Sequence, residues 1–158
     1  MATEPDQPET AQSEADPVEP TVFSLIIRGD IPGRFVWRDD DVVAFLTINP
    51  IQPGHALVVP VKEVDHWLDL DADLLARLTS VSQAIGRAQQ AAFDPVRVGV
   101  IIAGLEVPHC HVHLIPITSE AELSFSRADP DPDPAALDDA AARLRDALRT
   151  AGHAEVSD

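Results

Sequence analysis

Residues 106–115 read Glu-Val-Pro-His-Cys-His-Val-His-Leu-Ile, which places three of the chain's six histidines at alternate positions. Successive side chains of a β-strand point to opposite faces, and residues two apart are separated by about 6.6 Å. A strand over 109–117 therefore places His109, His111 and His113 on one face. The residues between them are apolar, which suits the buried face of a sheet. The stretch predicts a row of imidazoles above a packed core.

Three interpretations of this row compete. The histidines can have structural roles only. They can bind a metal, because a His-x-His pair on a strand directs both imidazoles to one side, but no suitable cysteine pair or second histidine pair stands elsewhere to complete the site. They can also act on phosphorus, since imidazole is a nucleophile that titrates near neutral pH and passes protons between groups.

The segments around the row predict an α+β fold with an antiparallel sheet of about five strands. Short runs rich in β-branched and aromatic residues, bounded by turn residues, indicate the strands. They are residues 35–37, 42–48, 55–60, 96–103 and 109–117. Apolar residues at helical spacing indicate one long helix over 69–93 and shorter helices over 22–28 and 135–151. Asp133 and Pro134 suit the N-cap and the first position of the last helix.

Composition and charge limit the class of protein. The 158 residues suit a single domain, and 27 acidic against 11 basic residues give a net charge of −16. A surface this acidic repels nucleic acids and anionic membranes, so we expect neither as a partner. No apolar run reaches the about 18 residues of a transmembrane helix. The single cysteine, Cys110, excludes an internal disulfide, and we expect a soluble cytoplasmic protein.

The two ends of the chain differ in composition from its middle. Residues 1–20 combine six acidic residues and four prolines with no Lys or Arg, which predicts a disordered tail. We expect the folded domain over 21–118 and an acidic, proline-rich linker over 119–134. The terminal amphipathic helix of 135–151 and a short tail of 152–158 complete the predicted organisation.

The pattern of residues 109–115, His-φ-His-φ-His-φ-φ with φ apolar, resembles the motif of the histidine triad (HIT) nucleotide hydrolases and transferases. The resemblance runs from about residue 21 to residue 116, and its matching segments lie within 23–32, 39–50 and 53–60. The nucleotidyltransferase branches of the family carry Gln in place of the third histidine. His113 therefore resembles the hydrolase branches.

The resemblance implies an enzyme that hydrolyses a purine nucleotide derivative, namely a phosphoramidate, an acyl-adenylate or a dinucleoside polyphosphate. His111 would attack the α-phosphorus and form a nucleotidyl-histidine intermediate, which water then hydrolyses. His109 and His113 would orient His111 and support phosphate binding and proton transfer. His55 resembles a further family histidine near the triad and is a candidate catalytic residue. The alternative for His55 is a histidine that packs against the turn at the entry of a strand.

The resemblance also implies a nucleotide pocket and a homodimer. Family members usually pair through the long helix and a strand. The residues alone would assign the apolar pocket members to the core, so their binding role rests on the resemblance. The candidate nucleotide-binding residues are Phe23, Ile26, Ile31, Phe45, Leu46, Thr47, Ile48, Glu106 and Val107. Two other functions stay open: a nucleotide-binding module with little turnover, and a metal-binding protein that uses the histidine row.

Several positions depart from the family pattern. Many bacterial members begin with a Cys-x-x-Cys pair that binds a structural zinc ion, whereas Thr21 and Ser24 stand at those places, so we predict no such metal and no cofactor. Thr47 stands where an acidic residue binds the ribose, which removes bidentate acceptance. Glu106 brings a carboxylate close to the phosphate site. We interpret Glu106 as facing the leaving group and favouring cationic substituents; the alternative is that it faces solvent.

Overall fold

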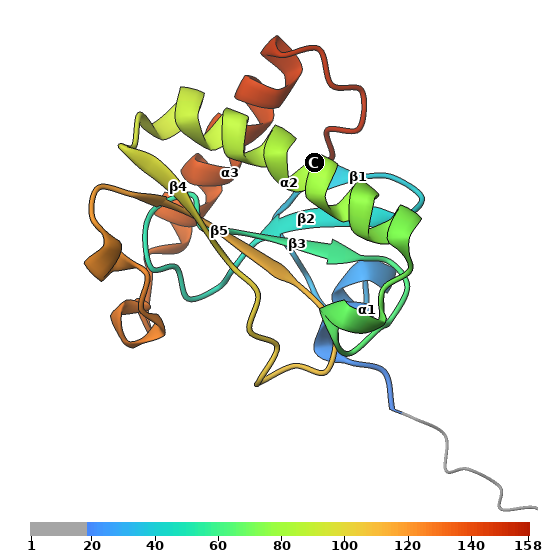
Figure 1. The fold of residues 1–158 in the computed structure, drawn as a ribbon. Coiled ribbons are helices and arrows are strands. Elements are labelled where there is room, and N and C mark those ends of the chain that lie inside the picture. The colour runs from blue at the N-terminus through green and yellow to red at the C-terminus, as the bar shows by residue number, and fades with distance from the viewer. Residues whose placement is uncertain (1–18) are drawn as a thin grey trace, which may run out of the picture.

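The computed structural model describes residues 19–158, so the predicted disordered tail falls almost entirely outside it. Five strands form one sheet in the order β1-β2-β3-β5-β4 (Figure 1). They are β1 (Phe35–Arg38), β2 (Val42–Leu46), β3 (Ala56–Pro60), β4 (Arg97–Ile101) and β5 (Val112–Ile117). All neighbouring strands are antiparallel, which confirms the predicted α+β fold. The strand that carries the end of the histidine row, β5, has a neighbour on each side.

Two helices cover one face of the sheet and enclose the main core (Figure 1). Helix α2 (Ala72–Phe93) begins after Asp71, whose side chain accepts a hydrogen bond from the Leu74 N–H. The helix was predicted to start at residue 69, so it starts three residues later than predicted. The preceding residues form a short 3₁₀ turn, η1 (Trp67–Asp69). Helix α3 (Pro134–Thr150) begins as predicted, with Asp133 as its N-cap. The core between these helices and the sheet contains Leu78, Ile85, Leu114, Leu144 and Leu148, all essentially buried.

The opposite face of the sheet has a thinner cover. Helix α1 (Val22–Arg28) lies there, and it begins at the Thr21 side-chain cap and ends at Gly29, whose φ of 85° is left-handed. Two 3₁₀ turns, η2 (Glu120–Glu122) and η3 (Phe125–Arg127), fall in the region predicted as a linker. The side chains under this cover form two small apolar clusters, one around Phe23 and Phe45 and one around Ile115.

The strand of the histidine row is shorter than predicted, because β5 begins at Val112 rather than at residue 109. Val112 pairs with Val58 of β3, so the continued register would bring Cys110 opposite Pro60. Proline has no N–H and cannot extend the ladder. The Cys110 N–H instead donates to the Val64 carbonyl at 2.7 Å. Strands β2 and β4 are also trimmed by one or two residues at their ends relative to the prediction.

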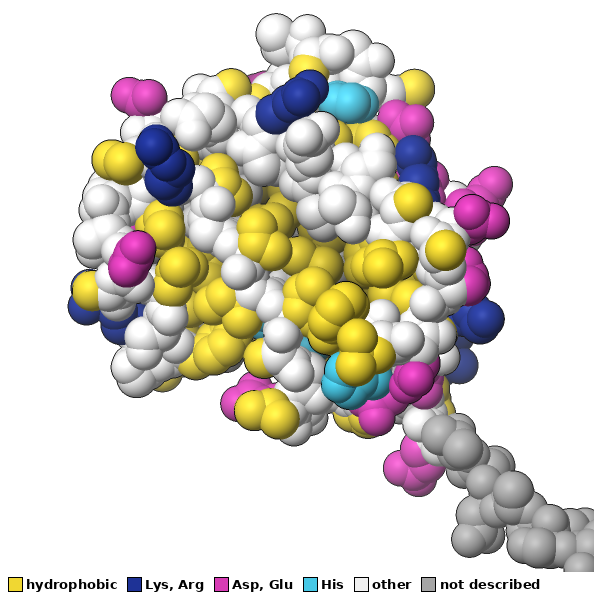
Figure 2. Space-filling model, in the orientation of Figure 1, with side chains coloured by type: hydrophobic (Ala, Val, Ile, Leu, Met, Phe, Trp, Pro, Cys, Tyr) yellow, Lys and Arg dark blue, Asp and Glu magenta, His cyan; other side chains and the backbone are white. Residues whose placement is uncertain are grey.

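The edge of the sheet at β1 is covered by other residues of the chain, whereas the edge at β4 is not within residues 19–158. Along β1, the Arg38 N–H donates to the Glu155 carbonyl, and the Arg145 guanidinium donates to the carbonyls of Phe35 and Ser157, so the C-terminal residues cover this edge. The outer edge of β4 has no such cover within residues 19–158. Figure 2 shows hydrophobic side chains gathered on the surface below α2 and over this strand, and Val100 is 60% exposed there.

Candidate functional site

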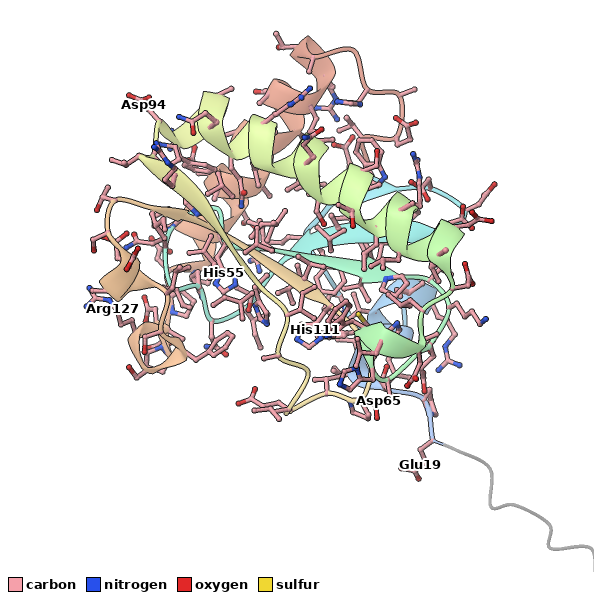
Figure 3. All side chains as sticks on the ribbon, in the orientation of Figure 1. Glu19, His55, Asp65, Asp94, His111 and Arg127 are labelled. Carbon is pink, nitrogen blue, oxygen red and sulfur yellow. The ribbon has the colours of Figure 1, made fainter. Side chains whose placement is uncertain are left out.

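The histidine row lies on the α1 side of the sheet, away from α2 and α3, and Figure 3 shows His55 and His111 on that side. The alternation predicted from the sequence holds in space. Cys110, Val112 and Leu114 point into the main core, whereas the His111 and His113 rings face each other with centroids 4.8 Å apart. The row therefore continues from β5 into the extended segment before it.

The His111 ring has one engaged and one free nitrogen. Its Nδ1 lies 2.8 Å from the His109 carbonyl oxygen. A carbonyl only accepts hydrogen bonds, so Nδ1 carries the proton and Nε2 of the neutral ring keeps its lone pair. Nε2 has no hydrogen-bond partner among residues 19–158. Burial lowers the pKa of His111, and the nearby Glu106 carboxylate offsets part of that lowering. His111 thus presents an unprotonated nitrogen at neutral pH.

His109 has no free nitrogen, which distinguishes it from His111. Its Nε2 donates to the Pro60 carbonyl at 2.8 Å, and its Nδ1 accepts from the Thr21 hydroxyl at 2.9 Å. The side chain is fully buried, and burial lowers its pKa. His109 therefore cannot offer a ring nitrogen to a ligand in this arrangement. It acts on His111 through its backbone carbonyl.

His55 and His113 form a directed hydrogen-bonded pair. The Ile51 N–H donates to Nδ1 of His55 at 3.1 Å, so the proton of the neutral His55 ring is on Nε2. That Nε2 lies 3.0 Å from Nδ1 of His113 and donates to it. The proton of His113 is consequently on its Nε2, and His113 presents a donor beside the lone pair of His111. His55, which was expected to lie near the triad, thus makes a direct hydrogen bond to His113.

The pKa values of this pair are strongly lowered. Burial, followed by the nearby His113, lowers the pKa of His55 to about 3. Burial, followed by His111, lowers the pKa of His113 to about 4. Both rings are neutral at pH 7, so the site offers hydrogen-bond donors and lone pairs to a phosphate rather than a row of imidazolium charges.

Aromatic rings flank the row at both ends. The Phe23 ring meets His111 edge-on at 4.9 Å between centroids and contacts Phe45 at 5.7 Å. At the other end, Phe125 of η3 packs edge-on against His113 at 4.9 Å, although its side chain is 47% exposed. Ile26 and Val107 pack against the cluster around Phe23. Aromatic side chains from α1 and η3 therefore flank the triad on its two sides.

The other candidate nucleotide-binding residues have different surroundings. The structure does not place the side chain of Leu46 near the histidines. This side chain is buried in the core under α2 and α3, on the far side of the sheet from the histidines. The Thr47 hydroxyl accepts from the Asn49 N–H and so caps the turn that follows β2. Ile48 is 69% exposed, and Ile31 is half-buried in the turn after α1. Glu106 is exposed and close enough to influence His111.

Three residues that the sequence analysis did not assign to the site contact the histidines or their supports. Thr21 bonds to His109, Phe125 contacts His113, and Gln89 of α2 donates to the carbonyls of Gly54 and Leu114, which adjoin His55 and His113. Gln89 is a fully buried polar residue on the apolar face of α2, and a polar residue in an apolar stripe is a sequence feature that could have identified it. No feature of the sequence around Phe125 indicates its contact with His113.

The residues at the expected cysteine positions do not fit a structural zinc site. The Thr21 hydroxyl is bonded to His109, and the Ser24 hydroxyl donates to the Glu63 carboxylate. A structural zinc site uses thiolates and imidazoles, which these hydroxyls do not replace. Across residues 19–158, no group of three or more His, Cys, Asp and Glu side chains is arranged to hold a metal ion.

Comparison with known proteins agrees with this site. Residues 28–120 match the HIT domain family, and this span includes the entire triad. The chain belongs to the HIT family. It is 36% identical over 103 residues to the purine nucleoside phosphoramidase of Escherichia coli, which covers 61% of this chain and 87% of that protein. It is also 36% identical over 99 residues to an uncharacterized HIT-like protein of Methanocaldococcus jannaschii, covering 60% and 77% of the two chains.

Solved HIT structures share the fold. A Hit-like protein of Bartonella henselae, described as involved in cell-cycle regulation, matches with a TM-score of 0.71 and 32% identity, over 80% of this chain and 95% of that one. A zinc-bound histidine triad family protein of Mycobacterium smegmatis matches with a TM-score of 0.71 and 28% identity, over 82% and 94%. Within residues 19–158 of the present chain, no helix has the length and apolar character needed to cross a membrane.

The lowered pKa values of His55 and His113 predict an acid-sensitive fold. Below pH 6.5, the unfolded chain binds protons at these two histidines. The folded protein binds them only near pH 3 at His55 and near pH 4 at His113. The free energy of unfolding must therefore fall as the pH falls from about 7 toward 4. His55→Gln preserves an acceptor for the Ile51 N–H and a donor for His113 without titrating.

Urea unfolding of the wild type and His55→Gln between pH 7.5 and pH 5 tests this prediction. We expect the slope of unfolding free energy against pH to be shallower in His55→Gln by up to about 1.4 kcal/mol per pH unit. Equal slopes in the two proteins would show that His55 is not held neutral in the fold.

Proposed function

We propose that this HIT protein is a nucleotide hydrolase that attacks the α-phosphate of a purine nucleotide derivative through a nucleotidyl-His111 intermediate. The observation that carries the proposal is the state of His111, the triad residue whose Nε2 is unprotonated and has no hydrogen-bond partner among residues 19–158. The name of the Escherichia coli relative, a purine nucleoside phosphoramidase, supports a phosphoramidate as one substrate class.

We assign a role to each ring in the first step from its hydrogen bonds. The bond between His111 Nε2 and phosphorus forms as the bond from phosphorus to the leaving nitrogen or oxygen breaks, and the leaving group takes up a proton from solvent water. Positive charge that develops on the His111 ring is stabilised by its Nδ1–H bond to the His109 carbonyl. His113 donates its Nε2–H to the phosphoryl group, because His55 holds its other nitrogen as an acceptor.

The second step restores the enzyme. Water attacks the phosphorus, the bond to His111 breaks, and the nucleoside monophosphate leaves. The attacking water releases one proton to solvent, which replaces the proton taken up by the leaving group, and the electrons of the broken bond return to Nε2, so His111 ends in its starting neutral form. We place the purine in the apolar pocket of Phe23, Ile26, Phe45 and Val107, because this cluster adjoins His111 directly.

The metal-binding alternative is less compatible with the hydrogen bonds of the row. Both nitrogens of His55 and both of His109 have partners, as does Nδ1 of His111 and of His113. Two Nε2 atoms then remain for a metal, whereas a tetrahedral site needs at least three protein ligands. The other alternative, a binding module with little turnover, has the same geometry and is separated by experiment.

We further propose that a second copy of the chain covers β4. Val96, Val100 and Ile102 are 58%, 60% and 37% exposed, and they line an open apolar groove with Ser82 and Gly86 of α2. An uncovered apolar edge strand is an association surface that monomeric proteins avoid. A symmetric pairing of two β4 edges, with α2 against α2, buries this surface.

Trapping of the intermediate tests the enzymatic proposal. A rapid alkaline quench of the wild type mixed with an adenosine phosphoramidate preserves the acid-labile bond between phosphorus and histidine, and it should give a protein whose mass is increased by one adenylyl group. His111→Ala should lack the adduct and lose on the order of 10⁴-fold or more in kcat/KM, because the nucleophile is gone. His66→Ala, which removes a histidine outside the row, serves as the control. A wild type that is thermally stabilised by the nucleotide without any turnover would identify a binding module.

Glu106 should select among leaving groups. Its exposed carboxylate acts on His111 and can attract a cationic substituent on the leaving amine. Glu106→Gln should therefore lower kcat/KM about 2- to 5-fold for an amine-bearing phosphoramidate, in line with an exposed charge pair. A matched neutral phosphoramidate should change little. Equal changes for both substrates would remove the proposed role.

The dimer has a direct test. Val100→Glu places a charge in the centre of the β4 surface and should convert the protein from a particle of twice the 17.0 kDa chain mass to a monomer, measured by light scattering after size-exclusion chromatography. Leu68→Glu changes a residue of η1 that is 67% exposed and away from the groove, and it should leave the mass unchanged. A wild-type monomer would overturn the proposal.

A further inference from the structure

Four polar side chains from three distant segments meet beside the histidine row. Thr21 and Ser24 come from the first turn of α1, Glu63 from the loop after β3, and His109 from the segment before β5. The Glu63 carboxylate accepts from the Thr21 N–H at 3.2 Å and from the Ser24 hydroxyl through the same oxygen. The Thr21 hydroxyl in turn lies 2.9 Å from Nδ1 of His109. We name these four residues the clasp.

The protons in the clasp have a single consistent direction. The Ser24 hydroxyl gives its proton to Glu63, and the Ser24 N–H donates to the Thr21 oxygen at 3.2 Å. The Thr21 hydroxyl has two acceptors within reach, Nδ1 of His109 at 2.9 Å and the Ser24 hydroxyl oxygen at 3.3 Å, and we assign its proton to the shorter bond to His109. His109 Nδ1 can accept it, since the proton of this neutral ring is on Nε2 and bonded to the Pro60 carbonyl. The ordering starts at the carboxylate of Glu63 and ends at a backbone carbonyl.

The fixed ring of His109 matters because of its backbone. The His109 carbonyl holds Nδ1–H of His111, and that bond leaves the lone pair of His111 on Nε2. The same α1 turn that supplies Thr21 and Ser24 carries Phe23, whose ring packs on both His109 and His111. A displacement of Thr21 therefore reaches His111 by two routes, through the His109 ring and through Phe23.

We propose that Glu63, Thr21 and Ser24 are positioning residues for His111, and that they hold the His109 ring, and through its carbonyl the tautomer of His111, without a metal ion. The proposal rests on the proposed function, since it assigns these residues to the reaction of His111. The buried part of the chain of bonds, from the Thr21 hydroxyl to His111, supplies the alignment, and the exposed Glu63 carboxylate orders it.

The first test separates the hydroxyl from the shape of the side chain. Thr21→Val removes the donor to His109 and keeps the branched shape, whereas Thr21→Ser keeps the donor. We expect Thr21→Val to lower kcat for an adenosine phosphoramidate by about 10- to 100-fold with KM changed by less than about threefold, because misalignment of a reacting group affects the chemical step. Thr21→Ser should recover most of the activity. Equal losses in the two variants would indicate only an effect on α1 and would overturn the proposal.

The second test does not depend on turnover. Nitrogen-15 NMR of the imidazoles reports which ring nitrogen carries the proton. In the wild type, the Nδ1–H form of His111 and the Nε2–H form of His109 should predominate. Thr21→Val and Glu63→Leu should add the Nε2–H form of His111, whereas His109 should keep the Nε2–H form that bonds to the Pro60 carbonyl. Glu120→Leu, which removes another exposed carboxylate, should give the wild-type spectrum.

The two readouts distinguish failure of this proposal from failure of the proposed function. If the wild type hydrolyses no nucleotide, the enzymatic function is wrong, and the tautomers still decide whether the clasp orders the ring of His111. If the wild type is active and the tautomer of His111 is unchanged in Thr21→Val and Glu63→Leu, the clasp does not position the nucleophile.

Discussion

The hydrogen bond from Nδ1 of His111 to the His109 carbonyl is the contact on which the site depends. It joins residues two apart, in the segment just before β5 where the pairing with β3 has stopped. Pro60 has two effects on this segment. Its missing N–H ends the pairing between β3 and the triad segment, and its free carbonyl accepts the Nε2–H of His109. A proline at the end of a neighbouring strand thus fixes the ring that supports the nucleophile.

Burial gives the site an electrical character that its histidine content would not suggest. Four imidazoles close together could form a cationic cluster, but desolvation lowers all four pKa values, and repulsion from a neighbouring histidine adds to the lowering at His55, His111 and His113. The neutral rings have fixed donor and acceptor nitrogens, because each ring bonds to a backbone group, a hydroxyl or another imidazole. In a chain with a net charge of −16, the proposed function therefore requires a phosphate to be held by oriented N–H groups rather than by imidazolium charges, with the lone pair of His111 as the attacking group.

The sequence predicted the parts of this arrangement that depend on local periodicity. The alternation of residues 109–114 places the imidazoles and the core residues correctly, and the Asp133-Pro134 pair marks the start of α3. The same alternation shows why Leu46 was misplaced. The resemblance treated residues 45–48 as one pocket segment, whereas neighbouring residues on a strand point to opposite faces, so Phe45 and Leu46 cannot share a site.

Contacts between distant segments could not be predicted from local periodicity, and these contacts place the last side chain that packs against the triad. Leu123 packs against Gly99 of β4, where a Cβ atom would collide with it, and the backbone of Asp129 bonds to Pro50 and Asn49. Between these two anchors the chain presents Phe125 to His113. Phe125 lies beyond residue 120, where the match to the HIT domain ends. The triad lies within that match together with its hydrogen-bond partners other than Thr21, whereas Phe23 and Phe125, the aromatic rings that flank the triad, lie on either side of the match.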